Sequence, residues 1–165
     1  NLMEDFKNHP DLSLALWRTA EGYYNQALAD QREHSQAQAK EHFAKVISLG
    51  ETIRRQVPAS SATAEAYFYS AECHYQRGED QKALAYFQTV VEKWPDYQYA
   101  WLAQARIAEI YKRFAVAGVM PDSEVEAALD VVYKRLLANY PDCPAAQTAR
   151  RWLEGRTKSS EGEEQ

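Results

Sequence analysis

The sequence contains little glycine, proline or cysteine, and this scarcity already restricts the fold. Among 165 residues, glycine and proline occur six times each and cysteine twice. Alanine, glutamine and glutamate are frequent, while alternating runs of β-branched residues are few, so the composition favours an all-helical fold. Cys73 and Cys143 have no metal-ligand spacing. Cys73 lies among predicted helix-core residues and is interpreted as a small buried hydrophobe.

Long apolar runs and an excess of basic residues are also missing. No stretch approaches the roughly 20 apolar residues that a membrane-spanning helix requires, so no direct insertion into a membrane is expected. The formal net charge is −5, which leaves no basic footprint for nucleic acid or for an anionic membrane. The chain also opens without the basic start and apolar run of a signal peptide.

Recognisable catalytic motifs are absent as well. The sequence has no glycine-rich phosphate loop, no Gly-x-Ser-x-Gly elbow and no His-Glu-x-x-His or Glu-x-x-His spacing around its four histidines. We therefore expect no enzyme, no catalytic residue, no metal and no cofactor. His74 occupies a predicted helix-core position and is interpreted as a structural histidine.

The most informative stretch is residues 64–95, which contains two amphipathic segments. Small and aromatic residues recur at helical spacing in each segment, and a turn around Gly78 separates them. Pro95 ends the second segment, because proline cannot continue a helix. The pattern predicts a helical hairpin with a short loop, which needs neighbours of the same kind to bury its apolar faces.

This hairpin resembles a tetratricopeptide repeat, whose signature is W-x2-L-G-x2-Y, then A-x3-F, then P. The corresponding positions are Tyr67, Ser70, Ala71, His74, Ala83, Phe87 and Pro95. The second half fits well, whereas all four first-half positions differ from the signature. Ala71 is still small enough for close approach of two helices.

The same pattern repeats on both sides and predicts the domain organisation. Ala39-x3-Phe43 precedes the central hairpin, and Leu129-x3-Tyr133 follows it. We expect one domain over residues 1–155, an all-α, α-α solenoid that the resemblance makes a right-handed superhelix of about three hairpins plus a capping helix. The predicted hairpins are at about 10–57, 61–94 and 97–140, the capping helix is at about 144–154, and a polar, flexible tail is at 156–165. Ser123 and Glu126 form a candidate capping box.

The resemblance also implies where a partner would bind, because the first helix of each tetratricopeptide hairpin lines the concave face. By alignment, each first helix contributes three side chains at i, i+4 and i+7, which share one helix face. The predicted partner-binding residues are Trp17, Glu21 and Tyr24 in repeat one, Phe68, Glu72 and Tyr75 in repeat two, and Leu102, Arg106 and Glu109 in repeat three. The alternative interpretation is that the aromatic residues are packing residues between repeats.

The function that the resemblance implies is a non-enzymatic scaffold that holds a protein or peptide segment in the concave groove. Apolar or aromatic anchors with a basic group near Glu21 and Glu72 would suit this groove, whereas the acidic tails of chaperones would not. The alternative is a structural module that self-associates, as a homo-oligomer or as part of a longer solenoid. The Tyr140-Pro141 ending resembles repeats of bacterial envelope proteins, namely outer-membrane assembly lipoproteins and the Tol-Pal coordination protein family, which favours a soluble protein of the periplasm over the cytoplasm.

Overall fold

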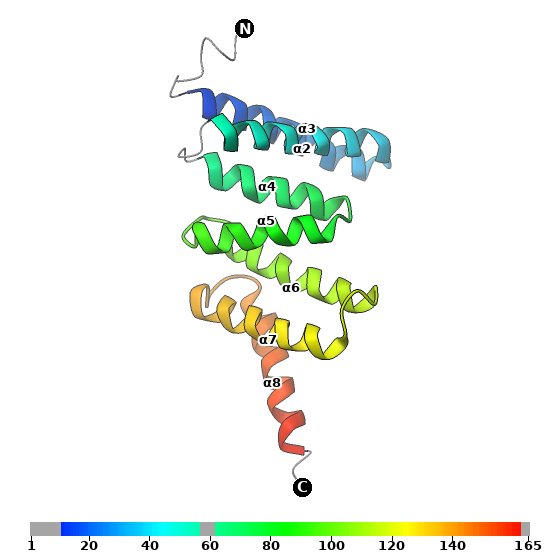
Figure 1. Cartoon of the computed structure of the whole chain (residues 1–165), viewed down its shortest axis with the longest axis vertical. Helices are drawn as coiled ribbons and strands as arrows, with labels where there is room; N and C mark the ends of the chain where they lie inside the picture. The colour runs from blue at the N-terminus through cyan, green and yellow to red at the C-terminus, as the bar shows by residue number, and fades with distance from the viewer. Residues whose placement is uncertain (1–10, 57–61, 163–165) are drawn as a thin grey trace. The chain divides into compact units, whose positions relative to one another are not determined.

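The computed structural model describes residues 11–56 and 62–162, with side chains as far as residue 156 (Figure 1). All regular structure in these ranges is α-helical, which confirms the predicted all-α fold of sequentially packed helices. The helices are α2 (Leu12–Arg32), α3 (Gln36–Gln56), α4 (Ala62–Gln76), α5 (Asp80–Lys93), α6 (Ala100–Val116), α7 (Asp122–Asn139) and α8 (Ala146–Gly162). The predicted boundary between the hairpins at about 10–57 and 61–94 lies at residues 57–61, outside the described residues.

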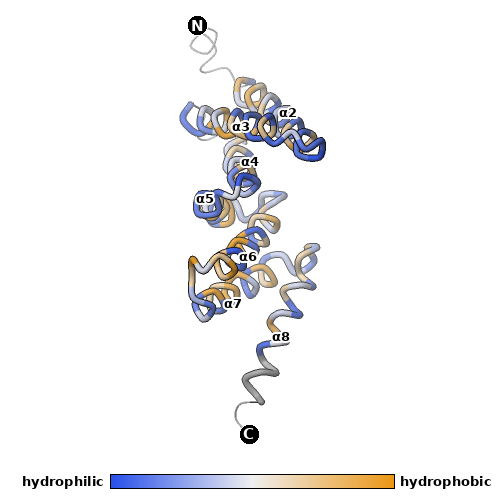
Figure 2. The backbone as a smooth tube through the Cα atoms, turned by 90° about the vertical axis from the view of Figure 1, so that its right-hand side faces the viewer, coloured by the Kyte–Doolittle hydropathy of each residue, from blue (hydrophilic) through white to orange (hydrophobic). Residues whose placement is uncertain are grey.

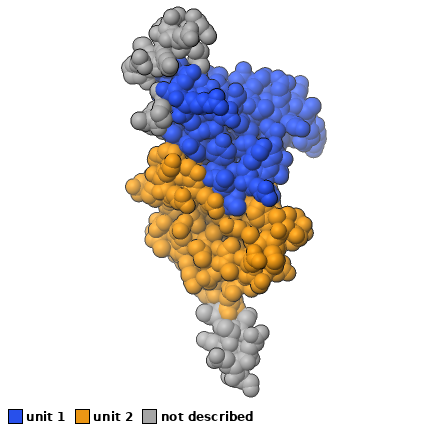
Figure 3. Space-filling model, viewed as in Figure 1, with its two compact units in different colours: residues 1–86 blue, residues 87–165 orange. Residues whose placement is uncertain are grey.

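The chain divides into two compact units, residues 1–86 and residues 87–165 (Figure 3). The boundary falls inside α5, between Tyr86 and Phe87. The first unit therefore contains α2, α3, α4 and the first turns of α5. The second contains the rest of α5 with α6, α7 and α8.

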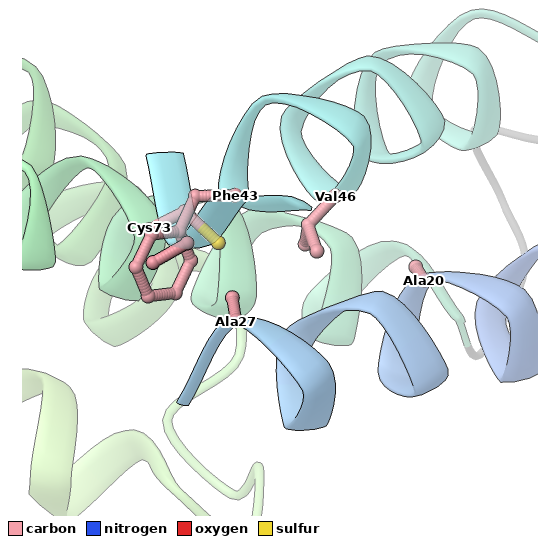
Figure 4. Packing of buried hydrophobic residues seen from close by; sticks show 6 residues of the cluster. Ala20, Ala27, Phe43, Val46 and Cys73 are labelled. Carbon is pink, nitrogen blue, oxygen red and sulfur yellow. The ribbon is translucent and has the colours of Figure 1, made fainter. Parts of the chain in front are cut away.

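In the first unit, neighbouring helices pack in chain order. Helix α2 packs against α3, α3 packs against α4, and α2 also contacts α4. Figure 4 shows small side chains of α2 facing Phe43 of α3 and Cys73 of α4, in a cluster whose members are at most 2% exposed. Small residues on one helix and a large ring on the next allow dense packing with few voids.

Helices α3 and α4 approach each other closely at Gly50. A Cβ atom at this position would lie 2.6 Å from the Ser70 hydroxyl oxygen and 3.2 Å from the carbonyl oxygen of Ala66. Such distances are too short for ordinary contact, so this crossing requires a residue without a side chain. Glycine is usually unfavourable inside a helix, but here it permits the approach of the two backbones.

In the second unit, α6 packs against α7, and α7 packs against α8. Hydrophobic segments are visible in both α6 and α7 (Figure 2). The buried side chains include Ile107 and Ile110 from α6, with Leu129 and Leu136 from α7. The Trp152 ring of α8 packs on a ring of α7 and completes this helix contact.

Three of the turns between helices have the same backbone structure. Each contains one residue with positive φ, which is His34 (63°), Gly78 (72°) or Gly118 (65°). In each turn the next residue donates its amide hydrogen to a carbonyl five residues earlier, over 2.7–2.9 Å. This hydrogen bond and the left-handed residue define the Schellman motif, which prefers glycine. His34 therefore occupies a position where a side chain is strained.

Replacing His34 by glycine is expected to raise the free energy of unfolding by about 0.5–1 kcal/mol. The relief of about 1–2 kcal/mol of left-handed strain is partly offset by the greater freedom of glycine in the unfolded chain. The reciprocal change, Gly78→Ala, should lower stability by a similar amount. Urea unfolding of both variants checks the pair, and a destabilised His34→Gly variant would contradict the prediction.

The ends of α5 and α7 also repeat one another. The amides of Trp94, Tyr97 and Ala100 form the same hydrogen bonds as those of Tyr140, Cys143 and Ala146, with matching turn conformations. Helix α8 thus begins in the same way as α6, at the position that the first helix of a hairpin occupies in the repeat. It continues to Gly162, past the sequence-based estimate near 154. No proline follows position 144, and a lone glycine at 155 does not end a helix.

The predicted capping box at Ser123 is wrong. Helix α7 begins at Asp122, and its N-cap residue is Pro121, two residues before the predicted cap and without a side-chain cap. The carbonyl oxygen of Pro121 accepts the amides of Glu124 and Val125 at 3.0 Å. The backbone bonds therefore place Ser123 inside the first turn, where its hydroxyl is not in the capping position.

Candidate functional site

The candidate site in the first unit centres on aromatic side chains shared by α2 and α4. The Tyr69 ring lies 4.6 Å from the Trp17 ring, 4.9 Å from the Tyr24 ring and 5.2 Å from the Phe68 ring, measured between centroids. Two of these pairs are edge-to-face, a geometry that adds about 0.5–1.5 kcal/mol to the burial of the rings. We call these four residues the α2/α4 aromatic cluster.

The three predicted residues of repeat one differ in exposure. Glu21 is exposed, while Trp17 and Tyr24 are half-buried. Leu14, one turn before Trp17 on the same helix face, is 45% exposed, which is unusual for a large apolar side chain in this protein. Helix α2 therefore presents an apolar residue and a carboxylate next to the aromatic cluster.

The three predicted residues of repeat two lie deeper. Phe68 and Glu72 are each 3% exposed, and Tyr75 is 9% exposed. The Tyr24 hydroxyl donates a 3.5 Å hydrogen bond to the Glu72 carboxylate, which links α2 to α4. These three predicted residues of α4 therefore contribute to the packing between helices.

In the second unit, the residues predicted for repeat three lie on α6. Leu102 and Arg106 are half-buried and Glu109 is exposed. The Arg106 guanidinium donates to the Glu109 carboxylate over 2.7 Å. These opposite charges, three residues apart, form an ion pair along the helix surface.

We call the side of α2 and α4 that carries the predicted binding residues the α2/α4 face. The sequence analysis did not identify two residues there, Tyr69 and Glu65. Tyr69 is central to the aromatic cluster, but the repeat alignment puts it beside the predicted face. Glu65 lies three residues before Phe68 and seven before Glu72, so these spacings put it on the predicted face of α4. The i, i+3, i+7 spacing of Glu65, Phe68 and Glu72 is the signal that would have found Glu65.

The Glu65 carboxylate is electrostatically unusual. Its Oε2 atom is buried and has no hydrogen-bond partner among the described residues. Burial raises the pKa of this carboxyl group above its ordinary value. A buried acceptor without a partner is unfavourable, so a donor from a ligand would be stabilised there.

A second polar cluster surrounds His74, where α4 turns into α5. The imidazole Nδ1 lies 2.7 Å from the Glu79 carboxylate, and the ring stacks on Tyr86 at 5.5 Å. Burial lowers the pKa of His74 and outweighs the opposite effect of Glu79, while Lys82 and Arg77 also favour the neutral ring. A neutral imidazole that donates from Nδ1 to Glu79 agrees with the structural role expected for this histidine.

This shift predicts that stability falls as the pH is lowered from about 7 towards 5. The unfolded chain, with the ordinary histidine pKa of about 6.5, takes up a proton before the folded protein does. The stabilising contribution is present above that value and is lost as the pH falls to the lower folded pKa, with a slope below about 1.4 kcal/mol per pH unit. Urea midpoints between pH 5 and 7 measure the slope, which should decrease in a His74→Gln variant.

Other reactive groups are limited in the described part of the chain. Burial raises the pKa of the Cys73 thiol, so it remains protonated and unreactive. Within residues 11–56 and 62–162, no group of three or more histidine, cysteine or acidic side chains could hold a metal ion. No helix of these ranges is both long and apolar enough to cross a membrane.

Comparison with known proteins identifies one segment of the chain. Residues 65–97, which include most of α4 and all of α5, match the family model described as tetratricopeptide repeat. The matched segment covers about a fifth of the chain, and a search of curated proteins found no match. The match supports the predicted tetratricopeptide resemblance of the central hairpin and, in general terms, a protein–protein interaction scaffold.

Proposed function

We propose that this protein is a non-enzymatic scaffold that binds a partner segment on the face formed by α2 and α4. The observation that carries this proposal is the half-buried Glu65 carboxylate, which helical spacing puts on that face and whose Oε2 has no partner in the described part of the chain. A lysine or arginine side chain of a partner would supply the missing donor, and the charge pair would be stronger than a neutral hydrogen bond.

The surrounding residues specify the rest of the ligand. Leu14 and the half-buried Trp17 provide apolar and aromatic contact area, and Glu21 adds an exposed negative charge. Aromatic side chains give large contact areas at a low cost in conformational entropy. The proposed ligand is therefore a peptide segment with an apolar anchor followed by a basic residue. By the repeat alignment, Leu102, Arg106 and Glu109 on α6 are the proposed partner-binding residues of the second unit.

The helices that carry this face are fixed by packing before a partner arrives. The Tyr24 hydroxyl is hydrogen-bonded to the Glu72 carboxylate, and the Tyr69 ring contacts three other aromatic rings. A preorganised surface loses little entropy on binding, and this improves affinity without additional contacts. Turnover chemistry plays no part in this mechanism.

The experiment is a selection from a displayed random-peptide library, followed by affinity measurement by calorimetry. We expect the enriched peptides to combine an apolar anchor with a basic residue. Glu65→Gln and Leu14→Lys should each weaken a selected peptide at least tenfold. Glu33→Gln, a matched change at an exposed glutamate at the C-terminal end of α2, should leave its affinity unchanged. Equal binding to all four proteins, or no enrichment, would contradict the proposal.

The rival function, self-association, is favoured by a different surface. Val116 and Val119 flank the Gly118 turn and are 92% and 57% exposed. Neighbouring exposed apolar residues often mark contacts with another protein. A solution mass that rises with concentration, and that returns to the monomer value in a Val116→Ser/Val119→Ser variant, would support this function. The compartment suggested by the envelope-protein resemblance stays a prediction.

A further inference from the structure

A second surface, in the second unit, has the features of a binding site. A hollow of about 330 Å³ lies between α5 and α7, and part of α6 lines it. Its apolar lining includes Val91, Ile107 and Val131, and the last of these is 58% exposed. Tyr111 contributes an aromatic ring, while Glu92 and Arg135 contribute opposite charges. We call this space the α5/α7 hollow.

One side chain of the lining has an unsatisfied polar atom. Gln104 is only 2% exposed, and its Nε2 donates a 3.0 Å hydrogen bond to the carbonyl oxygen of Val132. This bond determines which end of the amide is the nitrogen, because two oxygens would repel each other. The amide oxygen Oε1 has no partner within the described residues. A buried acceptor of this kind indicates a missing donor.

The first unit shows how an equivalent position is satisfied. In the repeat alignment Gln104 corresponds to Ser70, which is also fully buried. There Arg54 donates from Nη1 to the Ser70 hydroxyl over 3.2 Å. Its guanidinium lies over the rings of Tyr67 and Tyr86, at 5.1 and 5.0 Å. Thus an arginine from a neighbouring helix supplies the donor in the first unit.

We propose that the α5/α7 hollow binds an arginine side chain of a partner protein. Its guanidinium would donate to Gln104 Oε1 and face the Glu92 carboxylate. Its aliphatic stem would lie on Val131 and Tyr111, as a guanidinium and its stem do on aromatic and apolar surfaces elsewhere. This site belongs to the second unit and does not depend on the proposed α2/α4 face.

Arg135, on the rim of the hollow, opposes this binding through its like charge. Its side chain is exposed, so water reduces the repulsion. Because the like charge opposes binding, removing it should strengthen the binding of the partner arginine. An Arg135→Ala variant tests this sign directly and leaves the buried lining unchanged.

The test uses the full chain and the acetylated peptide amide Ala-Leu-Arg-Leu-Ala. Three peptides are compared, with arginine, with citrulline, which keeps the donors without the charge, or with norleucine, which keeps only the stem. NMR titration follows the Gln104 side-chain amide and the methyl groups of Val91 and Val131. We expect the arginine peptide to bind at least tenfold more tightly than the norleucine peptide, with citrulline between them.

Variants locate the interaction. Gln104→Leu and Val131→Lys should each weaken the arginine peptide about tenfold, and Arg135→Ala should strengthen it. Because Val131 is largely exposed, its variant remains informative even if Gln104→Leu alters the fold. Leu14→Lys and Glu65→Gln, which test the α2/α4 face, should also leave this affinity unchanged.

Three outcomes would overturn the proposal. The first is equal binding of the arginine and norleucine peptides. The second is that the methyl resonances of Val91 and Val131 do not shift at a millimolar peptide concentration, while the Gln104 side-chain amide shows only hydrogen exchange with water. The third is a set of shifts that depends on protein concentration alone, which would make a second copy the occupant. Each outcome is visible in the same titrations.

Discussion

Replacing Arg54 by alanine is expected to lower the free energy of unfolding by about 2–3 kcal/mol. The Arg54 guanidinium donates to the hydroxyl groups of Ser70 and Tyr86 over 3.2 and 3.0 Å and lies over two tyrosine rings. One side chain of α3 thereby contacts both α4 and α5. Alanine removes these contacts together and leaves a buried hydroxyl at Ser70 without its donor.

Two further variants separate the mechanism from a general effect of charge. Arg55→Ala, at the exposed neighbour, should change stability by less than about 0.5 kcal/mol. Arg54→Lys keeps the charge but loses the planar group that stacks and donates in two directions, so it should recover less than half of the loss. Guanidinium chloride unfolding measures all three variants. A full recovery by lysine would show that charge alone matters at this position.

Replacing Gly50 by alanine is the second change with a large expected effect. The added methyl group would meet the Ser70 hydroxyl at 2.6 Å and the backbone of α4 at 3.2 Å. Overpacking of this kind costs about 1–3 kcal/mol, and the better helix propensity of alanine returns up to about 1 kcal/mol. We expect a net loss of about 1–2 kcal/mol in the free energy of unfolding.

The same substitution at Gly22 is the matched control. Gly22 lies inside α2, and a Cβ there would have no described atom within 4 Å, so alanine should stabilise the protein by about 0.5–1 kcal/mol. In a Ser70→Ala background, the cost of Gly50→Ala should shrink, because the nearest clashing atom is gone. An unchanged cost in that background would assign the effect to the Ala66 carbonyl instead.

The two proposed sites share a physical basis, although they lie in different units. Each contains a buried acceptor oxygen that has no partner among the described residues, Glu65 Oε2 on α4 and Gln104 Oε1 on α6. Each proposal also includes an exposed apolar side chain, Leu14 or Val131. The charged acceptor selects a basic group, while the neutral amide selects a donor and depends less on charge. Binding at the two sites should therefore respond differently to salt.

The fold was largely predictable because helix periodicity is a local property of the chain. The spacing around Ala83 and Phe87 predicted the second helix of the central hairpin, and both residues are fully buried. Gly78 predicted the turn between α4 and α5 because its positive φ is common for glycine. His34 takes the same conformation, but it is not a glycine, so the sequence carries no comparable signal for this turn.

The candidate site was less predictable, since it depends on which faces the helices cover. The sequence placed Phe68 and Tyr75 on one helix face together with Glu72, but could not show that all three are nearly inaccessible. It also left out Tyr69, whose importance comes from the rings of α2 rather than from its own helix.

The sequence by itself determined the helical composition, the order of the helices and the tetratricopeptide character of the central hairpin. These follow from spacing, turn residues and proline positions, which act over a few residues. Only the tertiary structure decided that Glu65 and Gln104 each keep a buried acceptor without a partner among the described residues, and that packing requires glycine at position 50. Burial and contact depend on residues that are distant in the chain, and one helical pattern is compatible with many such arrangements.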